Sequence, residues 1–156
     1  MKKTEIRSVT AIDETDLQIL SVLRTEARTP VKHIAEKTYL SPTAVAARIE
    51  KLENEGYIEG YYARLDPKSF GYQIKAFIGL ELEPIQKKDF YPYIRTCPNV
   101  VECNCVTGEY SMLVEVLFKT TDELDRFINE LQHFGKTKTQ IVFSTVVEHR
   151  DGYIEL

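Results

Sequence analysis

The sequence of 156 residues predicts an α+β protein built in two parts. Residues 1–56 are expected to form a three-helix domain of the winged or helix-turn-helix kind. Residues 74–156 are expected to form a ferredoxin-like βαββαβ domain, and residues 57–73 a linker strand. Two observations support this division. Residues 41–56 carry the start and stop signals of one helix, and the spacing of apolar residues changes from a helical period to a period of two after residue 73.

The first helix is expected to begin after Asp13 and to run to about Thr25. The Asp13 side chain can accept a hydrogen bond from the helix start, and Asp16 in the first turn favours the positive end of the helix dipole. One broad face of this helix is apolar and is formed by Leu17, Ile19, Leu20 and Leu23. The spacing of these residues predicts that the face is buried.

The second helix is expected to be shorter, with Thr29 as its cap and Pro30 as its first residue. It is expected to end near Lys37, and residues 38–40 form a tight connection to the third helix. A short helix, a turn of three or four residues and a second helix together are typical of the helix-turn-helix motif.

The third helix, over residues 41–56, has recognisable signals at both ends. The Ser41 hydroxyl can cap its start, Pro42 fits the first helical position, and Gly56 can adopt the left-handed conformation that ends it. Its apolar stripe consists of Val45, Ile49 and Leu52. The other side chains of its first turns are small, so this end can approach another surface closely, for example the major groove of DNA. The alternative is an ordinary amphipathic surface helix.

The candidate DNA-binding residues lie along this third helix. Hydroxyls and backbone N–H groups at its start can meet a phosphate or a base edge, and small apolar side chains can contact a thymine methyl group. Basic residues one turn apart on its flank are placed for phosphates. The set is Ser41, Pro42, Thr43, Ala46, Ala47, Arg48 and Lys51. For Arg48 the alternative is a salt bridge to Glu55 or Glu26.

The second part begins with a strand in which Ala76, Ile78, Leu80 and Leu82 face one side. A helix over residues 85–97, a strand over 100–106, a turn over 107–110 and a strand over 111–118 follow. Thr120 and Glu123 have the spacing of a capping box and open a second helix. A loop over 133–136 then leads to a last strand over 139–148.

The face of this sheet that the helices leave open is expected to be apolar. It would carry Phe77, Leu113, Leu117, Val142 and Val146. Five large apolar side chains are unlikely to remain in water, so we expect a homodimer packed sheet to sheet. The alternative is that the linker tyrosines or the helical part cover this face within one chain.

The charge distribution favours focused contacts with a nucleic acid over a diffuse positive field. The net charge is −4, which argues against coating nucleic acid by charge alone. Residues 1–65 carry 10 basic and 10 acidic residues, and residues 66–156 carry 10 and 14. Binding through the first part would therefore need specific contacts, doubled by dimerisation.

Several classes of protein are not expected from this sequence. The charged N-terminus is not followed by an apolar stretch, and no apolar run approaches the length that crosses a bilayer, so we expect a cytoplasmic protein without membrane contact. The odd number of cysteines favours reduced thiols over disulfides or a metal site. No catalytic arrangement stands out, and no cofactor or metal is expected.

Four stretches together resemble the Lrp/AsnC (leucine-responsive, feast/famine) transcriptional regulators over about residues 12–150. They are IDETDLQILSVL, LSPTAVAARIEKLENEGYIEGYYARLDP, VVECNCVTGEY and TKTQIVFSTV. The resemblance implies an N-terminal helix-turn-helix domain that binds double-stranded DNA, a linking strand and a C-terminal ligand-responsive domain. It also implies dimers that assemble further, commonly into octamers.

In this family the turn that matches Thr107, Gly108, Glu109, Tyr110 and Ser111 lies at an interface between dimers and binds a free amino acid. A tight turn with a glycine can expose backbone N–H groups that hold a carboxylate. The family usually has an acidic residue where this sequence has Ser111. Either Glu109 replaces that acid, or the ligand differs, or none binds. The alternative is a plain β-turn.

Two other functions remain as alternatives to a DNA-binding regulator that responds to an amino acid. The first is a ligand-binding partner module that does not bind DNA. The second is an enzyme that resembles the sirohaem decarboxylases related to this family. Those carry an RHxxGxxxNxM-like run, whereas this chain has GYQIKAFIGLELE there, without His, Asn or Met. The sequence therefore favours the regulator.

Overall fold

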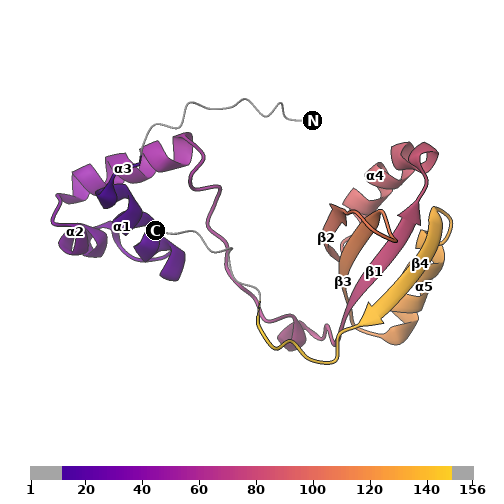
Figure 1. Ribbon diagram of the computed structural model, residues 1–156. Coiled ribbons are helices and arrows are strands. Elements are labelled where there is room, and N and C mark those ends of the chain that lie inside the picture. The colour runs from indigo at the N-terminus through magenta and orange to yellow at the C-terminus, as the bar shows by residue number, and fades with distance from the viewer. Residues whose placement is uncertain (1–11, 149–156) are drawn as a thin grey trace. The chain divides into compact units, whose positions relative to one another are not determined.

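The structure is a computed structural model that describes residues 12–148, and the chain divides into two compact units between Arg64 and Leu65 (Figure 1). Residues 12–64 contain three helices, α1 (Glu14–Thr25), α2 (Val31–Thr38) and α3 (Pro42–Asn54). Residues 65–148 contain the short 3-10 helices η1 (Pro67–Phe70) and η2 (Pro84–Gln86), the helices α4 (Lys87–Thr96) and α5 (Thr121–Leu131), and the strands β1 (Ile74–Leu82), β2 (Val100–Cys105), β3 (Met112–Phe118) and β4 (Gly135–Ile141). This order confirms the predicted fold class.

Helix α1 begins with the predicted cap. The Asp13 carboxylate accepts a hydrogen bond of 2.8 Å from the backbone N–H of Asp16, and the Asp16 carboxylate accepts one of 3.3 Å from that of Asp13. The two residues thus form a reciprocal capping box, which satisfies N–H groups that would otherwise lack a partner. The helix ends at Thr25, as predicted.

Helix α2 begins one residue later than predicted, and Thr29 does not cap it. The carbonyl of Pro30 accepts hydrogen bonds from the N–H groups of His33 and Ile34, so Pro30 itself takes the cap position. The Thr29 hydroxyl instead donates a hydrogen bond of 2.8 Å to the carbonyl of Glu26. The Thr29 hydroxyl is thus used by the preceding turn and does not cap α2.

Helix α3 confirms the end signals that were predicted for it. The Ser41 hydroxyl accepts a hydrogen bond of 3.2 Å from the N–H of Ala44, Pro42 is the first helical residue, and Gly56 has φ 78°. Val45 and Leu52 are fully buried in a core that the three helices share, together with Ile19, Ile34 and Ala35.

The predicted linker strand is not formed by residues 57–73, and the described residues 12–64 contain no wing strand. A strand needs a neighbour to which its N–H and C=O groups can bond, and this segment has none within the described chain. Its first part is instead held to α3, because the Tyr61 hydroxyl donates a hydrogen bond of 2.9 Å to the Glu53 carboxylate. Burial, helped by this carboxylate, raises the pKa of Tyr61 to about 12.

The second unit is one antiparallel sheet in the order β2-β3-β1-β4, with α4 and α5 on the same face (Figure 1). The alternation predicted for β1 is confirmed, because Ala76, Ile78, Leu80 and Leu82 are all buried. They pack with Phe90, Ile94, Leu124, Phe127 and Leu131 from the two helices. The predicted capping box of Thr120 and Glu123 is also present.

The last strand was predicted wrongly. It runs over Gly135–Ile141, not over residues 139–148, so the second half of the expected loop 133–136 belongs to the strand. Gly135 lies opposite Leu82 in the ladder, where a Cβ would collide with the carbonyl oxygen of Glu81. Glycine thus lets the chain enter the sheet directly after α5. The polar residues that follow Gly135 do not show the alternation of apolar residues that would have indicated a strand.

The open face of the sheet is less apolar than predicted. Val142 and Val146 lie beyond the end of β4, and Val146 is exposed. Phe77, Leu113 and Leu117 alternate with the buried residues of β1 and β3, as expected. Polar side chains share this face, because Lys75 and Glu115 form an ion pair of 2.7 Å there and Gln140 lies opposite Phe77.

Candidate nucleic-acid interface and ligand site

The start of α3 is open to solvent, as a helix that contacts DNA requires. Five of the seven predicted residues are exposed, namely Ser41, Pro42, Thr43, Ala46 and Ala47. The opposite side of the helix is the buried stripe of Val45 and Leu52. The exposed end is slim because its side chains are small, and among the described residues nothing bonds to the Thr43 hydroxyl.

Arg48 joins α3 to the start of α1. Its Nη1 lies 2.7 Å from the Asp13 carboxylate and 2.6 Å from the Asp16 carboxylate. Arg48 therefore forms a salt bridge within the protein, as the alternative predicted, but its partners are Asp13 and Asp16 and neither Glu55 nor Glu26. The side chain remains 31% exposed. Arg48 thus holds two helices together from the flank of α3.

Asp16 is the residue at this site that sequence reasoning missed. Its side chain is 1% exposed, and its carboxylate bonds to Arg48, accepts the N–H of Asp13 and lies 3.9 Å from Lys51 Nζ. Burying a carboxylate is costly unless it is paired in this way. A signal was present in the sequence, because Asp16 is spaced three, four and seven residues before Ile19, Leu20 and Leu23 and so lies on the buried stripe.

The pKa of the neighbouring Asp13 carboxylate is lowered by the groups around it. The hydrogen bond from the backbone N–H of Asp16, and next the one from Arg48, lower the pKa of Asp13. Asp13 therefore stays ionised in the folded state at pH values where a free aspartate begins to bind a proton. Asp13 thus remains a charged partner of Arg48.

A second exposed feature is Tyr39, in the turn between α2 and α3. It has φ 56° and is 94% exposed. A left-handed conformation is uncommon for a bulky residue. The turn therefore projects a tyrosine beside the start of α3, where sequence reasoning expected only a tight connection.

The predicted effector turn borders a cavity of about 280 Å³. Thr107, Glu109 and Tyr110 line it from the turn, and Gly79, Lys138 and Gln140 line it from the sheet. Gly108 has φ 120°, and nothing lies near the position that a Cβ would take. The turn is therefore open on that side.

Tyr110 depends on Gly79, which the prediction did not include. A Cβ on Gly79 would lie 2.7 Å from Tyr110 Cγ, so only glycine allows the ring to lie against β1. Lys138 Nζ lies 5.9 Å from the centre of this ring and 3.9 Å from the Glu109 carboxylate. Lys138 was missed because the start of β4 was predicted as a loop.

Ser111 was predicted to bind an effector, but its side chain bonds to the end of β1. Its hydroxyl accepts a hydrogen bond of 2.9 Å from the N–H of Leu82 and lies within 3.3 Å of the carbonyls of Leu80 and Leu82. It therefore anchors the turn to the end of β1. The Tyr110 hydroxyl donates a hydrogen bond of 3.0 Å to the Glu109 carboxylate, so three of the five predicted effector residues have side chains that bond within the protein.

Other kinds of site are not found in the part of the chain that the structure describes. There, no three His, Cys, Asp or Glu side chains are grouped so that they could hold a metal ion. Cys97, Cys103 and Cys105 are free thiols. None of the helices between residues 12 and 148 is both long and apolar enough to cross a membrane.

Comparison with known proteins places these features in context. Residues 12–59 match the model of a winged helix-turn-helix DNA-binding domain, and residues 75–151 match the Lrp/AsnC ligand binding domain. The chain is 33% identical to the transcriptional regulator LrpA of Bacillus subtilis over 84% of its own length and 97% of the relative's. It is 34% identical to the proline dehydrogenase transcriptional activator of Rhodobacter capsulatus over 88% and 94%.

Solved structures show the same fold. A transcriptional regulator from Neisseria meningitidis in complex with L-methionine has a TM-score of 0.85 and 27% identity, with 92% of this chain and 97% of that chain covered. A feast or famine regulatory protein from Mycobacterium tuberculosis, complexed with L-methionine, has a TM-score of 0.83 and 26% identity over 90% and 98%.

The fold and the exposed helix define a helix-turn-helix transcriptional regulator with a separate ligand-binding domain. The chain belongs to the Lrp/AsnC family. The resemblance drawn from its sequence is thereby confirmed.

The buried carboxylate leads to a first prediction. Asp16→Asn should lower the free energy of unfolding of the helical unit by about 1–3 kcal/mol, because Arg48 loses the charge of its buried partner. Glu14→Gln changes an exposed acid in the same turn and should stay within about 0.5 kcal/mol of the wild type. Urea unfolding followed by circular dichroism measures both. Equal stability of the two variants would show that the Asp16–Arg48 pair does not hold the helices together.

Proposed function

We propose that this regulator places the start of α3 in the major groove of duplex DNA, as a dimer, and that a free amino acid bound beside the turn over residues 107–111 modulates it. The observation that carries the proposal is the slim and solvent-exposed start of α3, whose opposite face is fixed in the core. We infer a cytoplasmic location, because DNA and free amino acids are both available there.

The DNA contacts follow from which groups at α3 are free. The Ser41 hydroxyl is used by the cap, but the first N–H groups of the helix and the Thr43 hydroxyl can approach a phosphate or a base edge. Ala46 and Ala47 allow close approach and contact with a thymine methyl group. Few of these side chains can read a base with two hydrogen bonds, so sequence preference would depend partly on DNA shape.

Contacts to phosphates are assigned to Lys51 and Tyr39. Lys51 lies on the flank of α3 and is 3.9 Å from Asp16, a separation that leaves its ammonium group able to turn toward a phosphate. The Tyr39 hydroxyl is exposed beside the helix start. Arg48 was predicted as a phosphate contact as well, but its two short ion pairs favour the role of positioning α3.

The groove contact can be tested with Ala46→Glu, which adds a negative charge to the exposed start of α3. DNA affinity should fall by at least about tenfold, because a carboxylate would meet the phosphates and base edges. Ala27→Glu makes the same change at an exposed site outside α3 and should bind DNA like the wild type. Fluorescence anisotropy with the duplex upstream of the protein's own gene measures both. Equal affinity of the two variants would exclude α3 as the reading helix, and a wild type that does not bind DNA would favour a ligand-binding module without DNA binding.

The salt dependence of the same binding separates the two basic residues. Lys51→Ala should reduce the slope of log K against log salt by about one, because one phosphate contact is lost. Arg48→Ala should weaken binding without changing the slope, because α3 loses its support instead of a phosphate contact. A slope that changes in Arg48→Ala but not in Lys51→Ala would reverse the two roles.

Dimerisation through the open face of the sheet would present two copies of α3. Phe77, Leu113 and Leu117 are only partly buried there, and the Lys75–Glu115 ion pair lies among them. A second copy could cover this mixed face, and dimers could assemble further, up to the octamers that the resemblance implies. The sheet face is thus the proposed homodimer interface.

This interface predicts a change of mass for Leu117→Glu. A buried charge in the interface should shift the protein from dimers or larger assemblies to monomers, because the carboxylate cannot be paired there. Ile85→Glu introduces the same charge at an exposed apolar residue of η2, away from this face, and should assemble like the wild type. Sedimentation equilibrium distinguishes the outcomes, and a monomeric wild type would contradict the proposal.

The amino-acid site is assigned to the cavity beside Tyr110. Backbone N–H groups at Thr107 and Gly108 would hold the carboxylate, and Glu109 the ammonium group. The cavity of about 280 Å³ is at the lower limit of ligand sites, which supports a site that a second chain completes. Two of the similar structures hold L-methionine, so this amino acid is a reasonable first ligand to test.

Glu109→Gln tests this assignment, because it keeps the shape of the side chain and removes the charge. Titration calorimetry should show L-methionine binding weakened by about tenfold or more. Glu102→Gln, on an exposed position of β2, should bind like the wild type. If both variants bind equally well, Glu109 does not hold the ammonium group.

A further inference from the structure

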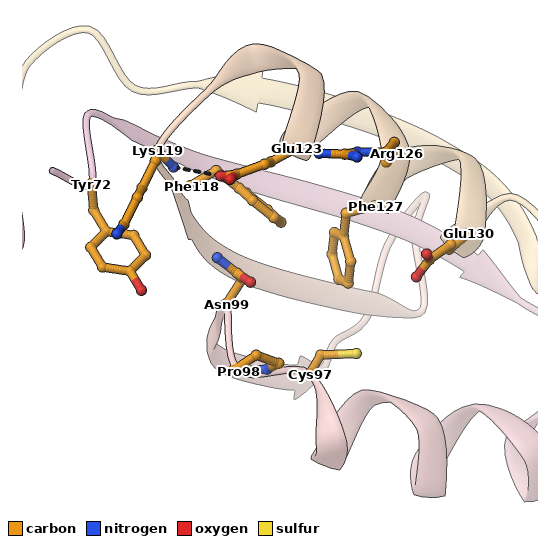
Figure 2. A pocket seen from close by; sticks show the side chains of 10 residues that line it. All are labelled: Tyr72, Cys97, Pro98, Asn99, Phe118, Lys119, Glu123, Arg126, Phe127 and Glu130. Carbon is orange, nitrogen blue, oxygen red and sulfur yellow. Dashed lines mark hydrogen bonds between the residues drawn. The ribbon is translucent and has the colours of Figure 1, made fainter.

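A larger cavity, of about 550 Å³, lies at the other end of β3 from the effector turn (Figure 2). Figure 2 shows it between the start of α5 on one side and the connection from α4 to β2 on the other. The two cavities have no lining residue in common. Its volume is within the range usual for small-molecule sites.

The floor of this cavity is aromatic. Phe118, at the end of β3, and Phe127, on α5, have ring centres 5.4 Å apart and are almost fully buried. Figure 2 shows the two rings beside each other, with Cys97 and Pro98 on the facing side. Because little of either residue is exposed, a flat apolar group of a ligand would contact the edges of these rings, and edge contacts are a favoured geometry for aromatic pairs.

Lys119 is a cation at the edge of this floor that has no carboxylate partner among the described residues. Its Nζ lies 5.2 Å from the centre of the Tyr72 ring. The nearby Glu123 does not neutralise it, because that carboxylate accepts the backbone N–H groups of Lys119 and Thr120 in the capping box of α5. The ammonium group is therefore available to a carboxylate from outside the chain.

Asn99 supplies an acceptor on the same side of the cavity. Its Nδ2 donates a hydrogen bond of 2.7 Å to the carbonyl of Leu117, and the N–H of Leu117 donates to the carbonyl of Asn99. These two bonds fix the side chain at the edge of β3. Its Oδ1 accepts no hydrogen bond within residues 12–148, and Figure 2 shows it between Tyr72 and Phe127.

From these groups we infer a second ligand site, which takes an aromatic carboxylic acid with a hydrogen-bond donor next to the carboxylate, that is, an aromatic α-amino or α-hydroxy acid. Lys119 binds the carboxylate, Asn99 Oδ1 accepts from the amino or hydroxyl group, and the ring of the ligand lies against the exposed edges of Phe118 and Phe127. The inference does not depend on DNA binding or on the effector turn.

Cys97 gives a direct measurement of occupancy. It lines the cavity, its Sγ lies 3.4 Å from the carbonyl of Tyr93, and burial raises the pKa of its thiol. A bound ligand should slow alkylation of Cys97 by iodoacetamide. Cys105 is exposed on β2 and outside the cavity lining, so it serves as an internal control. Mass spectrometry of the full-length protein follows both thiols.

The probe is L-phenylalanine, which should protect Cys97 in a saturable way and leave Cys105 unchanged. Lys119→Met should weaken this protection by about tenfold or more, and Lys119→Arg should restore most of it because it keeps the charge. Lys138→Met is the matched control, since Lys138 lies over Tyr110 much as Lys119 lies over Tyr72. In this variant L-phenylalanine should protect Cys97 as it does in the wild type.

Three results would overturn the inference. The first is no protection of Cys97 by L-phenylalanine at about 10 mM, a concentration at which even a weak site is occupied. The second is protection that is lost in Lys138→Met and kept in Lys119→Met, which would place the ligand at the effector turn. Equal protection by 3-phenylpropionate, which lacks the amino group, would exclude the contact with Asn99.

Discussion

The DNA-binding end of this molecule depends on one ion-paired cluster, in which Arg48 of α3 meets Asp13 and Asp16 at the start of α1. Asp16 is buried, so its charge requires a partner, and Arg48 is the cation closest to it. The same two aspartates cap α1. Helix formation and helix packing therefore use the same side chains, and the position of α3 follows from how α1 begins.

In the second unit, too, a few residues fix one element against another, but here the groups are neutral. Ser111 ties the effector turn to the end of β1, and Gly79 leaves room on β1 for the ring of Tyr110. Both contacts join a loop to β1, one of the two central strands of the sheet. The turn thereby gains a defined shape, and the N–H groups of Thr107 and Gly108, to which the proposal assigns a ligand carboxylate, take no part in these two contacts.

Strand β3 connects the two cavities of this unit. The effector turn precedes its start, and the aromatic cavity lies at its end, where the chain enters α5. Both places are ends of regular elements, where backbone groups are left without partners in the ladder. Each also has a lysine next to a tyrosine ring. The sheet thus has two separate cavities, and the one beside the effector turn reaches the open face, because Leu113 and Gln140 line it.

The sequence by itself determined the features that depend on a few neighbouring residues. The caps at Asp13, Ser41 and Thr120 and the alternation in β1 were predicted because each signal lies within one helical turn or one strand. Only the tertiary structure decided which partners Arg48 takes, where β4 begins, that Lys138 lies near Glu109, and that Ser111 bonds to the end of β1. These contacts join residues 25 or more positions apart, so their geometry depends on how the elements pack and not on local spacing.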